Sequence, residues 1–214
     1  MAVVRIDRAG VPFIVGPLAL AALLGAMPVW WWLPIPFALL GVFCLFFFRD
    51  PDRPIDTDIG DDVVLSPADG RVLVAGLASA DATPPGQWQQ VSIFLSPMDV
   101  HVNRVPASGR VTDVRFTPGR FLPAYRADAA SSNERSEIWV DHQGQTVVTR
   151  QIVGFLARRV VCRLASGTIV RAGDRLGVMK FGSRMDVFLP PSATLSVSVG
   201  QKVRGGETVI AVLH

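Results

Sequence analysis

An apolar stretch near the N-terminus constrains the fold of this chain more than any other feature. From Val11 to Phe48 the sequence contains no charged residue. As one helix at about 1.5 Å per residue it would be roughly 57 Å long, nearly twice the ~30 Å hydrocarbon core of a bilayer. Three prolines and three consecutive tryptophans interrupt it between positions 28 and 36. We therefore expect two apolar helices, Val11–Met27 and Ile35–Phe48, joined as a hairpin.

The charged residues on either side of this stretch predict its orientation. Arg5 and Arg8 precede it, and Arg49 and Arg53 follow it. A hairpin places both flanks on one side, and positive flanks favour the cytoplasmic side of the cell membrane. A cleaved signal peptide followed by a second span is disfavoured, because the run is too long and lacks a small-residue cleavage site. Whether the hairpin spans the bilayer or enters one leaflet is left open.

The remaining sequence has a β pattern. Residues 49–62 are rich in proline and aspartate and predict an extended linker. Evenly spaced β-branched runs separated by glycines then indicate a mainly β domain over residues 63–214, with a helical turn or two near Phe121–Ser132. The expected strands are Val63–Leu65, Arg71–Val74, Val91–Leu95, Gly109–Val114, Glu137–Asp141, Thr146–Ile152, Arg159–Leu164, Arg175–Lys180, Met185–Leu189 and Thr208–Leu213.

Two patterns occur twice in this domain. Pro67–Val72 is echoed by Pro106–Val111, and Val170–Gly177 by Val199–Val209. The repeated strand–turn–strand unit is similar to the sandwiched half-barrels of biotinyl and lipoyl carrier domains. We therefore expect a barrel-sandwich-hybrid-like β domain. This likeness concerns the fold and assigns no function.

Composition argues against several classes of function. The formal net charge is only +3, and no basic run is interleaved with aromatic residues, so we expect no nucleic-acid partner. The two cysteines, Cys44 and Cys162, lie in apolar surroundings without metal-ligand spacing. We expect no metal site.

The step from Gly182 to Ser183 is the first candidate for chemistry. A serine hydroxyl after glycine can attack the carbonyl just upstream, because glycine has no side chain in the way and tolerates strained backbone angles. The amide becomes an ester, and β-elimination then cuts the chain and leaves a pyruvoyl group at position 183. Since most Gly-Ser pairs are plain turns, the surrounding sequence must decide.

Several short blocks accompany this step along the chain: Phe48–Pro54, Leu65–Val72, Ile93–Pro106, Asn133–Arg135, Gln151–Gly154, Ala157–Arg159 and Phe181–Arg184. Together and in this order, they resemble the phosphatidylserine decarboxylase proenzymes, particularly the short bacterial and archaeal form. The resemblance runs from about Phe47 to the C-terminus. It implies a self-cleaving, pyruvoyl-dependent enzyme that converts phosphatidylserine to phosphatidylethanolamine and CO2.

The chemistry of decarboxylation agrees with that implication. Loss of CO2 from an amino acid leaves a carbanion, which needs an electron sink. Pyridoxal phosphate would need a lysine, and neither Lys180 nor Lys202 lies in a phosphate-binding glycine loop. We therefore expect a covalent pyruvoyl cofactor made from Ser183, which forms a Schiff base with the lipid amine.

His101 is the expected proton donor to the carbanion, because an imidazole titrates near neutral pH and the family motif includes it. His142 and His214 are expected at the surface. Asp69 lies in an Asp-Gly turn signal, and the resemblance ties the matching aspartate to the cleavage centre. For Asn103, Arg104 and Arg135, binding of the lipid phosphate or carboxylate and plain solvation are both open.

The chain departs from better-known relatives in two motifs. They carry a Leu-Gly-Ser-Thr cleavage site where this chain has Phe181-Gly-Ser-Arg184, and a second histidine where it has Arg104. Because arginine is a poor general base, an Asp-His-Ser relay for self-cleavage does not transfer. Either His101 serves both steps or Asp69 acts directly.

Two other functions remain to be weighed. Val178–Phe181 looks like the Met-Lys-Met turn of a biotin carrier, with Lys180 as acceptor, but a carrier leaves Ser183, His101 and Asp69 without a task. A structural membrane adaptor would need coiled-coil heptads, and none occur. The expected partners are the phospholipid substrate in the membrane and the chain's own cleaved C-terminal fragment, as a heterodimer; homo-oligomerisation is left open.

Overall fold

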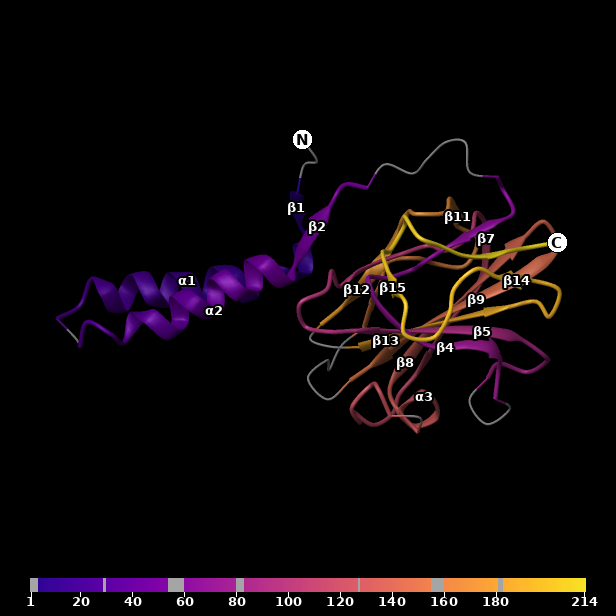
Figure 1. Cartoon of the computed structure of the whole chain (residues 1–214). Helices are drawn as coiled ribbons and strands as arrows, with labels where there is room; N and C mark the ends of the chain where they lie inside the picture. Colours follow the sequence, from indigo (N-terminus) through magenta and orange to yellow (C-terminus); the bar gives the residue numbers. More distant parts are fainter. Residues whose placement is uncertain are drawn as a thin grey trace. The chain divides into compact units, whose positions relative to one another are not determined.

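The computed structural model describes residues 4–28, 30–53, 60–79, 83–126, 128–154, 160–180 and 183–214. The chain divides into two compact units, Met1–Asp52 and Arg53–His214 (Figure 1). The first is a pair of apolar helices and the second is mainly β, so the expected fold class is confirmed.

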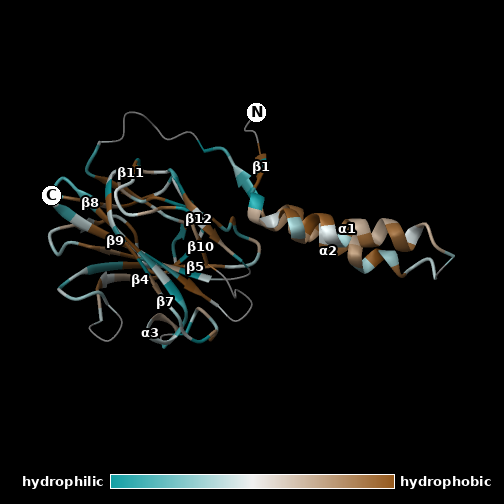
Figure 2. Cartoon of the chain, turned by 180° about the vertical axis from the view of Figure 1, so that it is seen from behind, coloured by the Kyte–Doolittle hydropathy of each residue, from teal (hydrophilic) through white to brown (hydrophobic). Residues whose placement is uncertain are grey.

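The first unit is a helical hairpin. Its helices are α1, Val11–Gly25, and α2, Pro34–Phe47, and a short 3-10 turn precedes α1. At its base β1, Val4–Ile6, pairs antiparallel with β2, Arg49–Pro51. Most residues of both helices are hydrophobic (Figure 2), and each helix exposes several large apolar side chains. The segment Arg8–Gly25 is long and apolar enough to cross a membrane, whereas α2 is shorter.

The second unit contains one curled eight-stranded antiparallel sheet and two three-stranded sheets. The large sheet has the order β11-β7-β8-β9-β13-β5-β4-β15, and the small ones have the orders β10-β12-β6 and β14-β16-β3. Every strand expected from the sequence overlaps an observed one, although Arg159 lies outside the described residues. The strands are β3 Val63–Leu65, β4 Gly70–Leu77, β5 Gln89–Leu95, β6 Val102–Arg104, β7 Gly109–Thr117, β8 Arg135–His142, β9 Gln145–Val153, β10 Val160–Cys162, β11 Ile169–Val170, β12 Arg175–Met179, β13 Ser183–Leu189, β14 Thr194–Leu195, β15 Lys202–Val203 and β16 Val209–Val212, and the one short helix is α3, Ala129–Ser132.

The unit is built from two copies of one arrangement. Strands β4, β5, β13 and β15 on one side of the large sheet correspond to β7, β8, β9 and β11 on the other, and each copy adds one small sheet. Both copies contain an irregularity at the same place, between Val72 and Val74 in β4 and between Val111 and Asp113 in β7. The echo between Pro67–Val72 and Pro106–Val111 is therefore structural.

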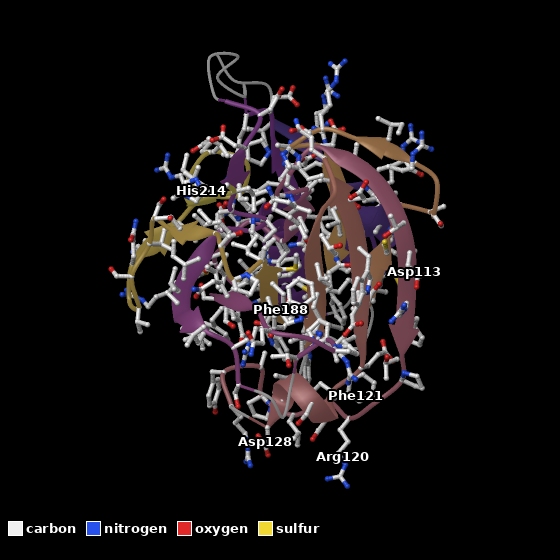
Figure 3. The ribbon with its side chains drawn as sticks, turned by 90° about the vertical axis from the view of Figure 1, so that its right-hand side faces the viewer. Asp113, Arg120, Phe121, Asp128, Phe188 and His214 are labelled. Atoms are coloured by element: carbon white, nitrogen blue, oxygen red, sulfur yellow. The ribbon has the colours of Figure 1, made fainter. Side chains whose placement is uncertain are left out.

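The two faces of the large sheet differ in character. Successive side chains of a strand point to opposite faces, so Met185 and Val187 lie on one face and Asp186 and Phe188 on the other. The first, which we call the core face, packs apolar residues of all three sheets together. The second, which we call the polar face, carries buried charged side chains as well as aromatic ones such as that of Phe188. Figure 3 shows Phe188 near the middle of the β unit, with His214 above it and Phe121 below it.

Candidate active site

Strand register brings the sequence blocks to one end of the large sheet. Ser183, where β13 begins, pairs with Leu95 at the end of β5 and with Val153 at the end of β9. The next pairs outward continue the same edge, since Ile152 faces Arg135, where β8 begins, and Phe94 faces Arg71 near the start of β4. We call this edge the site end. Blocks more than one hundred residues apart in sequence meet there.

Ser183 lies at the centre of the site end. Its side chain is fully buried, and its Oγ has no hydrogen-bond partner among the described residues. Alternation along β13 places it on the core face, beside the cluster of Ala68, Leu95, Met179 and Met185. A buried hydroxyl without a partner costs about 1–3 kcal/mol, so its placement is a feature to be explained by chemistry. Gly182, the other half of the predicted cleavage step, lies outside the described residues.

His101 is fully buried at the same end. Its backbone oxygen accepts a hydrogen bond from the N–H of Met179, at 3.2 Å, which ties it to the cluster beside Ser183. Its Nδ1 lies 3.0 Å from the carbonyl oxygen of Asp99. A carbonyl only accepts, so Nδ1 carries a proton there, and in the neutral ring Nε2 is the basic atom. The carboxylate of Asp99 in turn accepts from the N–H of Ser96 at 2.8 Å, which shapes the turn after β5.

The other two histidines lie elsewhere. His214 is exposed, as expected, and its Nε2 is 2.9 Å from Oγ1 of Thr194. The expectation that His142 is a surface residue is wrong, because only 5% of it is exposed. It lies two residues after Val140 on the core face, and its Nδ1 is 2.7 Å from the carbonyl oxygen of Ser108.

Asp69 is held by a cation that sequence reasoning did not assign. The guanidinium of Arg53 binds its carboxylate in a bidentate manner, Nη1 to Oδ1 and Nη2 to Oδ2, the latter at 2.8 Å. The N–H of Gly205 also donates to Oδ1 at 2.8 Å. The preceding residue, Ala68, packs in the cluster next to Ser183. Asp69 is therefore a fixed carboxylate at the border of the site. The signal that could have indicated Arg53 is its place in the block Phe48–Pro54.

The three candidate lipid-binding residues are not equivalent. Asn103 is fully buried, and its Oδ1 accepts from Nε2 of Gln151 at 2.8 Å, while its own Nδ2 has no partner among the described residues. Arg104 is 7% exposed and donates to the carbonyl of Gly173 at 3.2 Å. Plain solvation is therefore wrong for both. Arg135 lies at the site end, but its register places it on the polar face, away from the side chain of Ser183.

Asn133 is a site residue that sequence reasoning did not single out. It is fully buried, and its Nδ2 donates to the carbonyls of Leu122 and Val153, each at 2.8 Å. Its Oδ1 accepts from the N–H of Leu122 at 2.9 Å. It therefore fastens the loop between β7 and β8 to the strand end that pairs with Ser183. Its place in the block Asn133–Arg135 was the available signal.

Comparison with known proteins agrees with this arrangement. The model of the phosphatidylserine decarboxylase family matches residues 40–211. The chain belongs to this family. Curated relatives carry the name phosphatidylserine decarboxylase proenzyme. The protein of Pelodictyon phaeoclathratiforme is 43% identical over 91% of this chain and 91% of its own length. That of Nitrosomonas europaea is 40% identical over 98% of this chain and 95% of its own length.

In this decarboxylase family member, the residue after Ser183 is anchored on the polar face. Arg184 is 5% exposed, and its Nε donates to Oδ1 of Asp186 at 2.6 Å while its Nη2 donates to Oγ of Ser92 at 2.9 Å. On the neighbouring strand β9, Arg150 forms an ion pair with Glu137 of β8 at 2.7 Å. Burial lowers the pKa of the Arg150 guanidinium, and the nearby carboxylates of Glu137 and Asp186 oppose that shift. Arg184, one of the residues at which the chain departs from the family motif, therefore makes structural contacts on the polar face.

Exposed aromatic side chains surround the site end. Phe116 near the end of β7, and Phe121 and Tyr125 in the loop that follows, are all solvent-exposed. Among the described residues of the β unit, these are the exposed aromatic side chains. Met98, in the turn after β5, is 63% exposed, and the ring of Tyr125 packs edge-on against Phe94 at 6.2 Å between centroids. The loops at the site end therefore carry apolar groups in contact with solvent.

Proposed function

We propose that this chain is a phosphatidylserine decarboxylase that cuts itself between Gly182 and Ser183 and works with the pyruvoyl group so formed. The observation that carries the proposal is the buried hydroxyl of Ser183 at the first position of β13, which has no hydrogen-bond partner among the described residues. The strand partner of Ser183, Leu95, belongs to the cluster that also contains Ala68, the residue before Asp69, and Met179, whose N–H donates to the carbonyl of His101. Membership of the decarboxylase family supplies the substrate class.

Self-cleavage is a sequence of three balanced steps. The Oγ of Ser183 attacks the carbonyl carbon of Gly182, and the C–N bond is replaced by a C–O ester bond. Removal of the Cα proton of residue 183 then expels the carboxylate of residue 182 and leaves a dehydroalanyl terminus. Water converts this terminus to the pyruvoyl group and ammonia. The steps need a base near Ser183, and His101 and Asp69 are the candidates.

The sheet suits a chain that is cut at this position. β13 pairs along its length with β5 on one side and with β9 on the other. The same C-terminal fragment contributes β14, β15 and β16. After cleavage the fragment 183–214 therefore stays bound as a heterodimer with the remainder, and its new terminus stays at the site end.

The prosthetic group and the side chains of this chain have different roles in turnover. The pyruvoyl carbonyl supplies an electron sink by condensing with the substrate amine. His101 delivers the proton to the carbon that has lost CO2, which suits a buried imidazole whose neutral form is basic at Nε2. The amide of Asn103, whose Nδ2 has no partner among the described residues, binds the anionic head group. A role for Arg104 in that binding stays a prediction, because Arg104 follows Asn103 in β6 and points to the opposite face, where it donates to the carbonyl of Gly173.

The hairpin and the exposed aromatic groups support action on a membrane lipid. Extracting an acyl chain into water costs about 0.8 kcal/mol per CH2, so the enzyme works at the surface where the lipid lies. We place this enzyme on the cytoplasmic face of the cell membrane, because arginines flank the hairpin on both sides. The exposed side chains of Phe121, Tyr125 and Met98 are then candidates for contact with the lipid surface.

The decisive experiment is intact-mass analysis of the purified protein with an assay for phosphatidylethanolamine. Two fragments that meet at position 182/183, the smaller one with a pyruvoyl terminus, support the proposal. An intact chain that is active, or a chain modified at Lys180, would show a different mechanism or a carrier.

A second experiment separates the membrane role from the chemistry. Deletion of residues 11–48 should leave self-cleavage intact, because its groups lie in the β unit. Turnover on vesicles should fall sharply, whereas turnover on a short-chain, water-soluble substrate should change little. Equal losses on the two substrates would show that the hairpin does more than hold the enzyme at the lipid surface.

A further inference from the structure

The sequence block Phe48–Pro54 has no role in the mechanism described so far, yet one of its residues reaches the site. Arg53 is the next residue after Asp52, where the helical unit ends, and belongs to the β unit. Its side chain is 10% exposed, and the carboxylate that it binds, that of Asp69, is 15% exposed. This ion pair is therefore largely shielded from water, unlike the surface pair between Arg5 and Asp52, whose side chains are 63% and 37% exposed.

The geometry around this pair defines the position of both carboxylate oxygens. The planar guanidinium fork matches a carboxylate, so two parallel hydrogen bonds fix the rotation of the carboxyl group. Nη1 of Arg53 also donates to the carbonyl of Gly205 at 2.7 Å, and the N–H of Gly205 donates to Asp69 at 2.8 Å. Glu207 approaches Nε of the same guanidinium at 3.5 Å. Arg53 thus connects the aspartate to the loop before β16 as well.

The rest of the loop that carries Asp69 is held by backbone contacts. Oγ of Ser66 donates to the carbonyl of Ala68 at 2.7 Å, and the N–H of Arg104 donates to the carbonyl of Pro67 at 2.8 Å. These contacts fix the path of the chain but leave the carboxyl group free to rotate. The N–H of Gly205 holds one carboxylate oxygen, and the fork of Arg53 holds both and so fixes the rotation of the carboxyl group.

The equivalent loop in the other copy of the repeat has no charged pair at this position. Ser108 occupies the position equivalent to Asp69, and its Oγ accepts from the N–H of Ala172 at 3.0 Å, as Asp69 accepts from Gly205. The backbone-to-side-chain contact is therefore common to both copies. The negative charge and its bidentate arginine belong only to the copy that contains Ser183.

We propose that Arg53 is a positioning residue for self-cleavage, which acts by holding the carboxylate of Asp69 in one orientation at the border of the site. This inference rests on the proposed function, because it takes Asp69 to serve the cleavage centre. It assigns to the block Phe48–Pro54 a role inside the centre in addition to that of a connection to the helical unit.

A double-mutant cycle on the full-length precursor tests this proposal. The variants are Arg53→Ala, Arg53→Lys, Asp69→Asn and the double variant Arg53→Ala/Asp69→Asn, and the readout is the first-order rate of cleavage by intact mass. Arg53→Ala should cleave about 10- to 100-fold more slowly, a part of the 10²–10⁴ that a well-placed acid or base supplies. Arg53→Lys should recover part of the rate, because it keeps the charge and loses the fork.

The cycle also distinguishes positioning from general stabilisation. If Arg53 acts through Asp69, then Arg53→Ala should have no further effect in the Asp69→Asn background. Arg71→Ala is the matched control, an exposed arginine two residues after Asp69 that binds only the carbonyl of Gly200 among its described contacts. Equal slowing by the control, independent losses in the double variant, or a normal rate for Arg53→Ala would each overturn the proposal. A wild-type precursor that never cleaves would instead overturn the proposed function.

Discussion

Gly70 and Gly109 occupy equivalent positions in the two copies of the repeat, and both lie against the neighbouring strand. A Cβ atom on Gly70 would come 2.2 Å from the carbonyl oxygen of Phe94, and one on Gly109 would come 2.2 Å from that of Asp141. Arg71 and Arg110, the next residues, pair with the same two neighbours. The backbones of the two copies are therefore closely alike, and the chemistry differs only in what each copy places on that backbone.

The copies differ in how their central strands are connected. β8 and β9 are joined by Gln143 and Gly144, both with positive φ, a tight two-residue hairpin. The equivalent strands β5 and β13 are distant in sequence, and β13 is entered from β12. Gln145, the first residue of β9, is equivalent to Ser183, the first residue of β13. Gln145 pairs with His142, the last residue of β8, and Ser183 pairs with Leu95, the last residue of β5. Because β12 and β13 belong to different sheets, a cut before Ser183 would not open a hairpin, whereas a cut before Gln145 would.

The largest expected effect comes from exchanging the nucleophile. Ser183→Ala should give one uncut chain without decarboxylase activity, because both the attack and the pyruvoyl group need its Oγ. The equivalent change Gln145→Ala, which removes a 2.9 Å hydrogen bond to the carbonyl of His214, should cleave and turn over normally. Intact mass and product formation measure both. Cleavage of the Ser183 variant would break the comparison between the two positions.

The second expected effect concerns the two buried histidines, each of which places Nδ1 against a carbonyl. His101→Ala should lower turnover per cleaved molecule by about 10²–10⁴, the usual contribution of a general acid or base. His142→Ala should lower the melting temperature but leave turnover per folded molecule unchanged. Near-normal turnover by cleaved His101→Ala would remove this residue from the mechanism.

The same His101 variant also sharpens the assignment of the base in self-cleavage. If His101→Ala cleaves at the wild-type rate, Asp69 is the group that serves cleavage and His101 serves turnover alone. If it stays uncut, one imidazole serves both steps. The time course of intact mass after synthesis of the precursor decides between them.

More of the fold than of the candidate site could be predicted from the sequence. Alternating β-branched runs and glycine turns suffice for the strands, because each pattern is local. Ser183 and His101 follow from motif likeness. The pairing of Arg53 with Asp69 and of Asn103 with Gln151 could not be predicted, since each joins segments whose distance depends on the register of the whole sheet. The burial of His142 was missed for a similar reason, because the face that the end of β8 presents follows from its pairing.

The smallest expected effect concerns the arginines that follow the equivalent glycines. Arg71 donates to the carbonyl of Gly200 at 2.7 Å, and Arg110 donates to that of Gly167 at 3.3 Å, and both bonds are exposed. Replacing either residue with alanine should change the free energy of unfolding by about 0.5 kcal/mol or less, as for most surface sites. Neither change should alter the cleavage rate. Chemical denaturation and intact mass measure the two quantities.

Arg71 is as close in sequence to Asp69 as Arg110 is to Ser108, so a selective loss of cleavage in Arg71→Ala would show that the site extends onto this exposed edge. Equal, small effects in both copies would instead confine the difference between them to the core face, which carries Ser183 and the cluster of Ala68, Leu95, Met179 and Met185.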